Sequence, residues 1–220
     1  MSIYNVLAGF SGAASFSATY VGFVGNSASN TTSDTYSSIN IGTADATRIL
    51  VLCISGAGSG GATGGVTSVT CNGVSMNMQV SLTTSRSPSA IYTLNVASGT
   101  TATFVINHAS GAYAAELYAL YNTTNGGTAT STASAYTASS LPSMTLTMPT
   151  GGAAIYTIWQ QSAPPASPAF SVGTINDNHS VYPTSAIICG IYTPTPSGSV
   201  TNTVSGYSAV LASYACASFI

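Results

Sequence analysis

Apolar and polar residues alternate along several stretches of this sequence, and this alternation is its most constraining feature. In residues 75–82, Met76, Met78, Val80 and Leu82 alternate with polar residues. A period of two places successive side chains on opposite faces of a β-strand, so each such stretch predicts a strand with one buried face. The same alternation occurs in three further stretches, residues 92–96, 102–106 and 144–148.

Other segments predict strands by composition and by the turns between them. Residues 48–55 (RILVLCIS) form a short apolar run rich in β-branched residues, which predicts a central strand buried on both faces. Residues 187–192 are similar, and residues 210–219 are expected to close the sheet. Residues 113–121 (YAAELYALY) have helical propensity, but the segment is short and flanked by glycine and asparagine, which favours a strand. Asn72-Gly73 predicts a type I′ hairpin.

The predicted strands follow one another roughly every 10–15 residues, with Gly/Ser/Thr-rich connections between them. We therefore predict an all-β fold, an antiparallel β-sandwich of jelly-roll type, with an immunoglobulin-like sandwich as the alternative. Residues 1–18 are predicted to be an N-terminal arm, and residues 19–220 a single domain with a long loop at 122–140. No repeat of 20–50 residues is visible, which argues against a solenoid or a propeller.

Charged residues are almost absent, and their scarcity excludes several functions. Only 3% of the 220 residues are charged, with two Lys plus Arg and four Asp plus Glu. Two arginines cannot form the basic patch that nucleic-acid binding requires. The longest unbroken apolar run, residues 49–54, is far too short for a membrane-spanning helix. We therefore expect neither nucleic acid nor membrane as a partner.

This lack of charge favours a protein that works inside an assembly. Soluble β-proteins usually protect their strand edges with lysine or other charges, and this chain has no lysine. A β-rich chain without such protection would aggregate at high concentration unless its edges were covered. We therefore expect a homo-oligomer, with a trimer as one option.

The sequence contains no motif that predicts an enzyme, a cofactor site or a metal site. Glu116 has no carboxylate near it in sequence to form a glycosidase pair. Asp177, Asn178 and His179 cluster, but they supply too few ligands for calcium or zinc. The four cysteines lie in apolar segments without metal-ligand spacing; disulfides Cys53–Cys71 and Cys189–Cys216 are left open.

Three residues are candidates for contacts with a partner or a glycan. Arg48 precedes the buried run, and we expect it to pair with Asp45 or Asp34, or to form an inter-subunit salt bridge. Tyr156 and Trp159 lie near two glutamines and could form an aromatic platform for sugars. The alternative is that Trp159 ends a core strand.

Several segments resemble β-sandwich proteins of tailed bacteriophages. Residues 19–25 (TYVGFVG), 41–55 (IGTADATRILVLCIS) and 66–77 (VTSVTCNGVSMN) look like their opening strands. Residues 92–106 (YTLNVASGTTATFVI), with the SGTTA turn, residues 114–121 and residues 215–219 (ACASF) also fit.

This resemblance covers most of residues 19–219 and implies a structural virion protein. The function it favours is a capsid decoration or cement protein that packs on the major capsid protein and on sister copies. The alternative is a tail or fibre module that binds host-surface glycan. Residues 1–20 lack a basic segment followed by an apolar one, so we expect no secretion signal and a protein made in the host cytoplasm for the virion.

Overall fold

The computed structural model describes residues 14–27, 31–58, 65–82, 88–109, 111–138, 143–160, 169–182, 185–193, 197–205 and 211–220. These residues form strands, turns and bends without a helix, which confirms the all-β prediction. Accordingly, the described part of the chain has no helix of the length and hydropathy that a membrane crossing requires. All strand pairs are antiparallel, and the predicted β-sandwich is confirmed.

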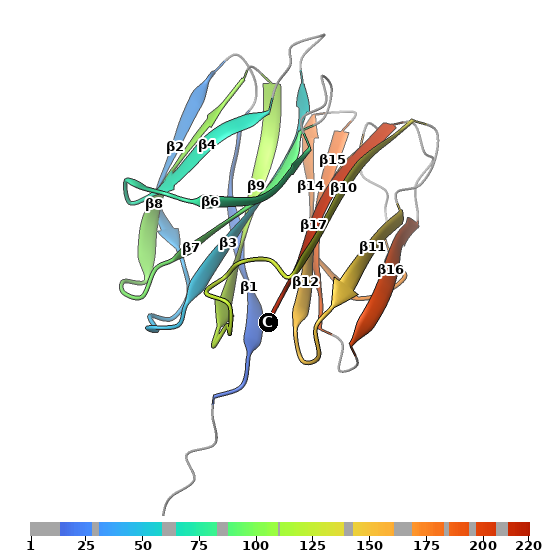
Figure 1. The fold of residues 1–220 in the computed structure, drawn as a ribbon. Helices are drawn as coiled ribbons and strands as arrows, with labels where there is room; N and C mark the ends of the chain where they lie inside the picture. Colours follow the sequence, from blue (N-terminus) through green and yellow to red (C-terminus); the bar gives the residue numbers. More distant parts are fainter. Residues whose placement is uncertain are drawn as a thin grey trace, which may run out of the picture.

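The N-terminal half of the chain forms two sheets that face each other (Figure 1). The inner sheet has the order β1-β9-β3-β7-β6, and the outer sheet has the order β2-β8-β4-β5. The strands are β1 (Ser17–Ser27), β2 (Ser33–Asn40), β3 (Ile49–Gly58), β4 (Val66–Cys71), β5 (Val74–Ser75), β6 (Asn77–Leu82), β7 (Ser89–Asn95), β8 (Thr101–His108) and β9 (Gly111–Tyr121).

The C-terminal half forms two further sheets. Its inner sheet has the order β10-β17-β12-β15-β14, and its outer sheet has the order β11-β16-β13. The strands are β10 (Ser131–Ala138), β11 (Ser143–Met148), β12 (Ala153–Gln160), β13 (Ala169–Phe170), β14 (Thr174–Tyr182), β15 (Ser185–Tyr192), β16 (Gly198–Ser205) and β17 (Leu211–Phe219).

The two halves have the same strand order. If β1 is matched with β10, β3 with β12, β6 with β14, β7 with β15 and β9 with β17, the two inner sheets coincide strand for strand. The outer sheets also coincide when β2, β8 and β4 are matched with β11, β16 and β13. In both halves the first three strands alternate between the inner and the outer sheet. The chain therefore contains two sandwiches of like strand order, which we call the duplication; the finer jelly-roll type and the single-domain boundary stay predictions.

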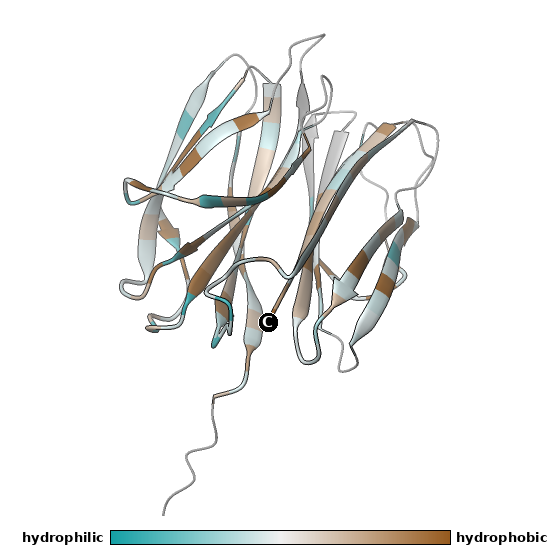
Figure 2. Cartoon of the chain, viewed as in Figure 1, coloured by the Kyte–Doolittle hydropathy of each residue, from teal (hydrophilic) through white to brown (hydrophobic). Residues whose placement is uncertain are grey.

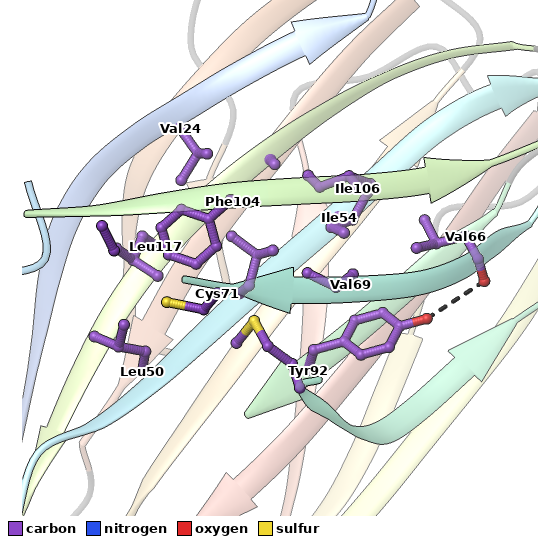
Figure 3. Close-up of a cluster of buried hydrophobic side chains, with 14 of the residues drawn as sticks. Val24, Leu50, Ile54, Val66, Val69, Cys71, Tyr92, Phe104, Ile106 and Leu117 are labelled. Carbon is purple, nitrogen blue, oxygen red and sulfur yellow. Dashed lines mark hydrogen bonds between the residues drawn. The ribbon is translucent and has the colours of Figure 1, made fainter. Parts of the chain in front are cut away.

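Three apolar cores lie between the four stacked sheets. The first, shown in Figure 3, lies between the sheets of the N-terminal half and includes Leu52, Phe104 and Leu117. The second joins the two inner sheets, and the third fills the C-terminal sandwich. As a result β3 and β12 are covered on both faces, as the apolar run at residues 48–55 predicts. The outermost strands β11 and β16 instead alternate along their length (Figure 2), with Met144 and Leu146 inward.

Local predictions are confirmed at two places. Residues 113–121 lie within strand β9, at the centre of the fold. Asn72 and Gly73 both have positive φ, 50° and 79°, as a type I′ turn requires. The hairpin is short, however: Thr70 pairs with Ser75 and Cys71 with Val74, after which the chain crosses to the inner sheet as β6.

Two predicted segments differ from the structure. The long loop predicted at residues 122–140 contains β10, an edge strand paired with β17 along its whole length. The Ser, Thr and Ala residues of β10 give it little hydrophobic pattern, since an edge strand covered mainly by small neighbours needs few large side chains. The predicted arm at residues 1–18 lies largely outside the described residues, and its last residues, Ser17 and Ala18, belong to β1.

Candidate functional site

An acid pair lies where the two inner sheets meet along one side. Glu116, on β9, is 1% exposed, and Asp177, on the edge strand β14, is half-buried. The Tyr20 hydroxyl, on β1, is 2.6 Å from Glu116 Oε2 and 3.2 Å from Asp177 Oδ2. The neighbouring Tyr118 hydroxyl donates to Asn176 Oδ1 at 3.1 Å. We call Tyr20, Glu116 and Asp177 the seam cluster.

The seam cluster holds a proton at neutral pH. Burial raises the pKa of Glu116 to about 8; the Tyr20 hydrogen bond opposes this change, and the negative charge of Asp177 reinforces it. Among the described residues, no donor satisfies Glu116 Oε1. A protonated Glu116 can itself donate a hydrogen bond, so protonation removes both the charge repulsion and the need for a donor. A carboxyl group whose pKa is raised by burial and by a neighbouring acid is a pattern also found in acid–base sites.

A second polar cluster ties the outer sheet of the N-terminal half to its inner sheet. Asp34 Oδ2 lies 2.8 Å from His108 Nε2 and accepts from the Tyr113 hydroxyl at 3.0 Å. His108 Nδ1 lies 2.7 Å from the carbonyl oxygen of Ala109. Burial alone would raise the pKa of Asp34, but hydrogen bonds from His108, Ser27, Tyr113 and Thr31 lower it below its ordinary value.

The second cluster does not form a nucleophilic triad. Each ring nitrogen of His108 already faces an oxygen of the chain, so neither nitrogen is left to activate a hydroxyl nucleophile. His108 and Tyr113 line a small hollow together with small and apolar residues of the neighbouring segments. The cluster therefore connects β2, β8 and β9, and its hydrogen bonds hold the outer sheet to the inner sheet.

Arg48 is fully buried and binds backbone carbonyls. Within the described residues, no carboxylate lies at salt-bridge distance from it, so the predicted pairing with Asp45 or Asp34 is wrong. Two loops at the strand entry turn their carbonyl groups inward, and the five N–H groups of one guanidinium satisfy them. The acceptors are the carbonyls of Ile41, Gly42, Thr43, Val96, Ser98 and Gly99, at 2.8–3.3 Å.

The other two predicted contact residues also lie inside the protein. Tyr156 belongs to the core of the C-terminal sandwich, and Trp159 to the core between the inner sheets. Their exposed fractions are 0% and 2%. This placement fits the interpretation of Trp159 as the end of a core strand, and neither ring offers a face to a sugar.

A chain of buried hydroxyl groups crosses the interface between the inner sheets. Ser55 Oγ donates to Ser89 Oγ at 3.0 Å and lies 2.7 Å from Thr157 Oγ1, while Ser89 Oγ lies 3.0 Å from Ser213 Oγ. Cys189 Sγ donates to Thr157 Oγ1. Because Ser55 uses its one proton on Ser89, Thr157 must donate to Ser55, and Thr157 itself accepts from Cys189; between Ser89 and Ser213 either hydroxyl can be the donor. No sequence pattern marks this network, since its members are dispersed among many serines and threonines.

The four cysteines are free and buried. Cys53 lies in the core between the two inner sheets, whereas Cys71 lies in the core of the N-terminal sandwich. The N-terminal inner sheet separates these two cores. Cys189 and Cys216 are likewise separated by the C-terminal inner sheet. Neither disulfide left open by the sequence is therefore present.

The described surface carries almost no charge. Arg48, Glu116 and His108 are buried, Asp34 and Asp177 are partly buried, and Asp45 is the one charged side chain that the described residues expose freely. The large apolar side chains that are most exposed are Val74 on β5 and Met78 on β6, at 57% and 59%.

No protein-family model matches this sequence, and a search of curated proteins gave no match.

Proposed function

We propose that this chain is a structural protein of a bacteriophage particle, a decoration or cement protein that packs on the major capsid protein and on sister copies. The observation that carries the proposal is the nearly uncharged described surface, on which Asp45 is the one freely exposed charge. Burial of Arg48 and Glu116 makes the described surface even less charged than the composition indicates. A surface of this kind suits permanent contacts better than free diffusion.

The strand edges support the same conclusion. The short strand β5 and the strand β6 are edge strands of the two sheets in the N-terminal half, and they carry the exposed side chains Val74 and Met78. Within these two strands no charged residue guards the edge. Unpaired backbone groups beside exposed apolar side chains favour contacts with another protein surface.

The outermost sheet of the C-terminal half offers hydroxyl groups instead of ions. Outward positions of β11 and β16 are serine and threonine, and Thr145 Oγ1 lies 2.8 Å from Thr201 Oγ1 across the two strands. Contacts that depend on such hydroxyl groups and on the burial of surface area involve little attraction between charges. Attachment to a capsid would therefore be nearly independent of ionic strength.

Copy number in purified particles tests the proposal. Particles of the phage whose genome encodes this chain would be purified in low and in high salt, and the chain quantified by mass spectrometry against the major capsid protein. A shell component should be present in hundreds of copies and stay bound at high salt. Absence from particles, or loss from them as salt rises, would contradict the proposal, and a few copies would indicate a tail part instead.

A further inference from the structure

We propose that the two halves of this chain also pair between chains: the inner sheet of the N-terminal half binds the inner sheet of the C-terminal half of a second copy. This exchange is independent of the proposed virion role. It follows from the duplication, because an interface between two like sandwiches has the geometry of a dimer interface enclosed within one chain.

Several contacts between the halves have a counterpart, as they do in a two-fold dimer, although the contact of β17 with β7 has no counterpart of similar extent. Strand β1 contacts β14, and the matching strands β10 and β6 contact each other. Likewise the contact of β9 with β14 has its counterpart in β17 with β6, and that of β3 with β15 in β12 with β7. Strands β3 and β12, which match each other, are in mutual contact at the centre. This pattern approximates an isologous interface.

Each half needs the other to cover an apolar face. In the N-terminal half this face includes Val51, Ile91, Tyr118 and Leu120. In the C-terminal half it includes Ile155, Trp159, Ala217 and Phe219. Exposed contiguous faces of this kind are unstable in water, so an opened chain would capture any complementary half within reach. The hydroxyl bonds from Ser55 to Thr157 and from Ser89 to Ser213 favour an N-terminal half facing a C-terminal half.

The linker between the halves decides whether pairing occurs within one chain. Residues 122–130 connect β9 to β10 and meet both ends of the described chain: Asn122 Nδ2 donates to the Ser15 carbonyl at 3.0 Å, and Thr124 N donates to the Ile220 carbonyl at 2.9 Å. In Figure 1 this connection passes close to the C-terminus. A second copy can therefore supply one of the two halves if the linker rearranges, and this rearrangement is confined to the end of the molecule where the linker lies.

The length of the linker can be weighed against the distance it spans. From β9 to β10 the chain crosses about three strand spacings of ~4.8 Å and one sheet-to-sheet distance of ~10 Å, or roughly 17 Å. Removing residues 123–128 leaves four Cα–Cα steps between Tyr121 and Ser131, which reach about 14 Å when extended. The shortened chain cannot close on itself without undoing strand ends, whereas pairing between two chains keeps every sheet contact.

The test compares this deletion with a matched control in which residues 123–128 are replaced by a Gly/Ser segment of equal length. Size-exclusion chromatography with light scattering should show the deletion variant as a dimer and the control as a species of half its mass. Both should have the same circular dichroism. An exchanged dimer separates only by unfolding, so it should persist for hours after a hundredfold dilution. A deletion variant that is monomeric, or a dimer that dissociates at once on dilution, would overturn the proposal.

A second measurement covers a deletion variant that does not fold. Unlabelled and ¹⁵N-labelled full-length chains are denatured together, refolded at high concentration and examined by native mass spectrometry. The exchange predicts mixed dimers that survive dilution, and their yield should rise with the protein concentration during refolding. Refolding that gives no persistent mixed dimers at any concentration would contradict it.

Discussion

The Tyr20 hydroxyl donates a hydrogen bond of 2.6 Å to Glu116, a carboxyl group whose pKa burial raises to about 8 although this bond lowers it. The same hydroxyl lies 3.2 Å from Asp177 on the opposite inner sheet. One phenol thus touches two carboxyl groups contributed by the two sandwiches. Because the pKa of Glu116 is raised to about 8, the pairing of the halves is linked to pH.

We expect the free energy of unfolding to fall as the pH rises from about 4.5 to about 8. The folded chain keeps a proton on Glu116 that the unfolded chain releases above its ordinary pKa of 4.5, so stability from this group is highest below that pH. Glu116→Gln should flatten the dependence and stabilise the protein by about 1–3 kcal/mol at pH 8.5. Urea unfolding at pH 5, 7 and 8.5 measures this.

The matched control for the seam cluster is Asp45→Asn, whose carboxyl group is exposed. This variant should keep the pH dependence of the wild type. If Glu116→Gln follows the wild-type curve as closely as Asp45→Asn does, Glu116 is not the group that links folding to pH.

Replacing Arg48 should be among the most destabilising single changes. Arg48→Lys keeps the charge but offers a single nitrogen where the guanidinium reaches two loops, so several buried carbonyls lose their donors. We expect a loss of about 2–4 kcal/mol in urea unfolding. Asp45→Asn, in the same loop and exposed, keeps the oxygen that accepts from Thr47 N and should change little. An Arg48→Lys variant as stable as the wild type would show that the loops keep their shape without the guanidinium.

The buried hydroxyl chain should contribute through coupling between its members. Ser55→Ala and Thr157→Val each remove one group of a 2.7 Å pair and leave the other without its partner. A double-mutant cycle should give a coupling of about 0.5–1.5 kcal/mol. The exposed pair Thr145–Thr201, at 2.8 Å, is the matched control and should couple much more weakly. Equal couplings at the two sites would mean that burial adds nothing to this network.

The four thiols should be inaccessible in the folded protein. Burial raises the pKa of Cys71 to about 11 and that of Cys216 to about 12, so the reactive thiolate is scarce at neutral pH. A colorimetric thiol reagent at pH 7.5 should therefore react slowly with the native chain and titrate four thiols in guanidinium chloride. Rapid reaction of any cysteine before unfolding would contradict the buried positions.

The strands could be predicted from the sequence because the hydrophobic pattern of each strand lies within a few consecutive residues. The alternation at residues 144–148 and the apolar run at 48–55 each report what one strand buries, and the structure confirms both. The duplication was missed because two sandwiches can share a strand order with little shared sequence. A trace remains in Ser-Ala-Ile, which begins β7 at residue 89 and β15 at residue 185.

The seam cluster could not be predicted, because its members come from strands far apart in the sequence. Glu116 lacks a carboxylate neighbour along the chain, and only the packing of the two inner sheets brings Asp177 to it. Arg48 was singled out correctly as unusual, but its partners are carbonyl groups, which every residue has and no sequence pattern marks.

Fusion of the two sandwiches into one chain has a consequence for their chemistry. On one side of the interface β9 and β14 bring together the carboxyl groups of Glu116 and Asp177; on the matching side, where β17 meets β6, Gln79 Oε1 accepts from the Ala129 amide at 2.8 Å. A dimer of identical subunits would have to carry the acids on both sides or on neither. Because the two halves belong to one chain, the two sides of the interface can differ in sequence. The side with Glu116 and Asp177 then responds to pH, whereas the side with Gln79 does not.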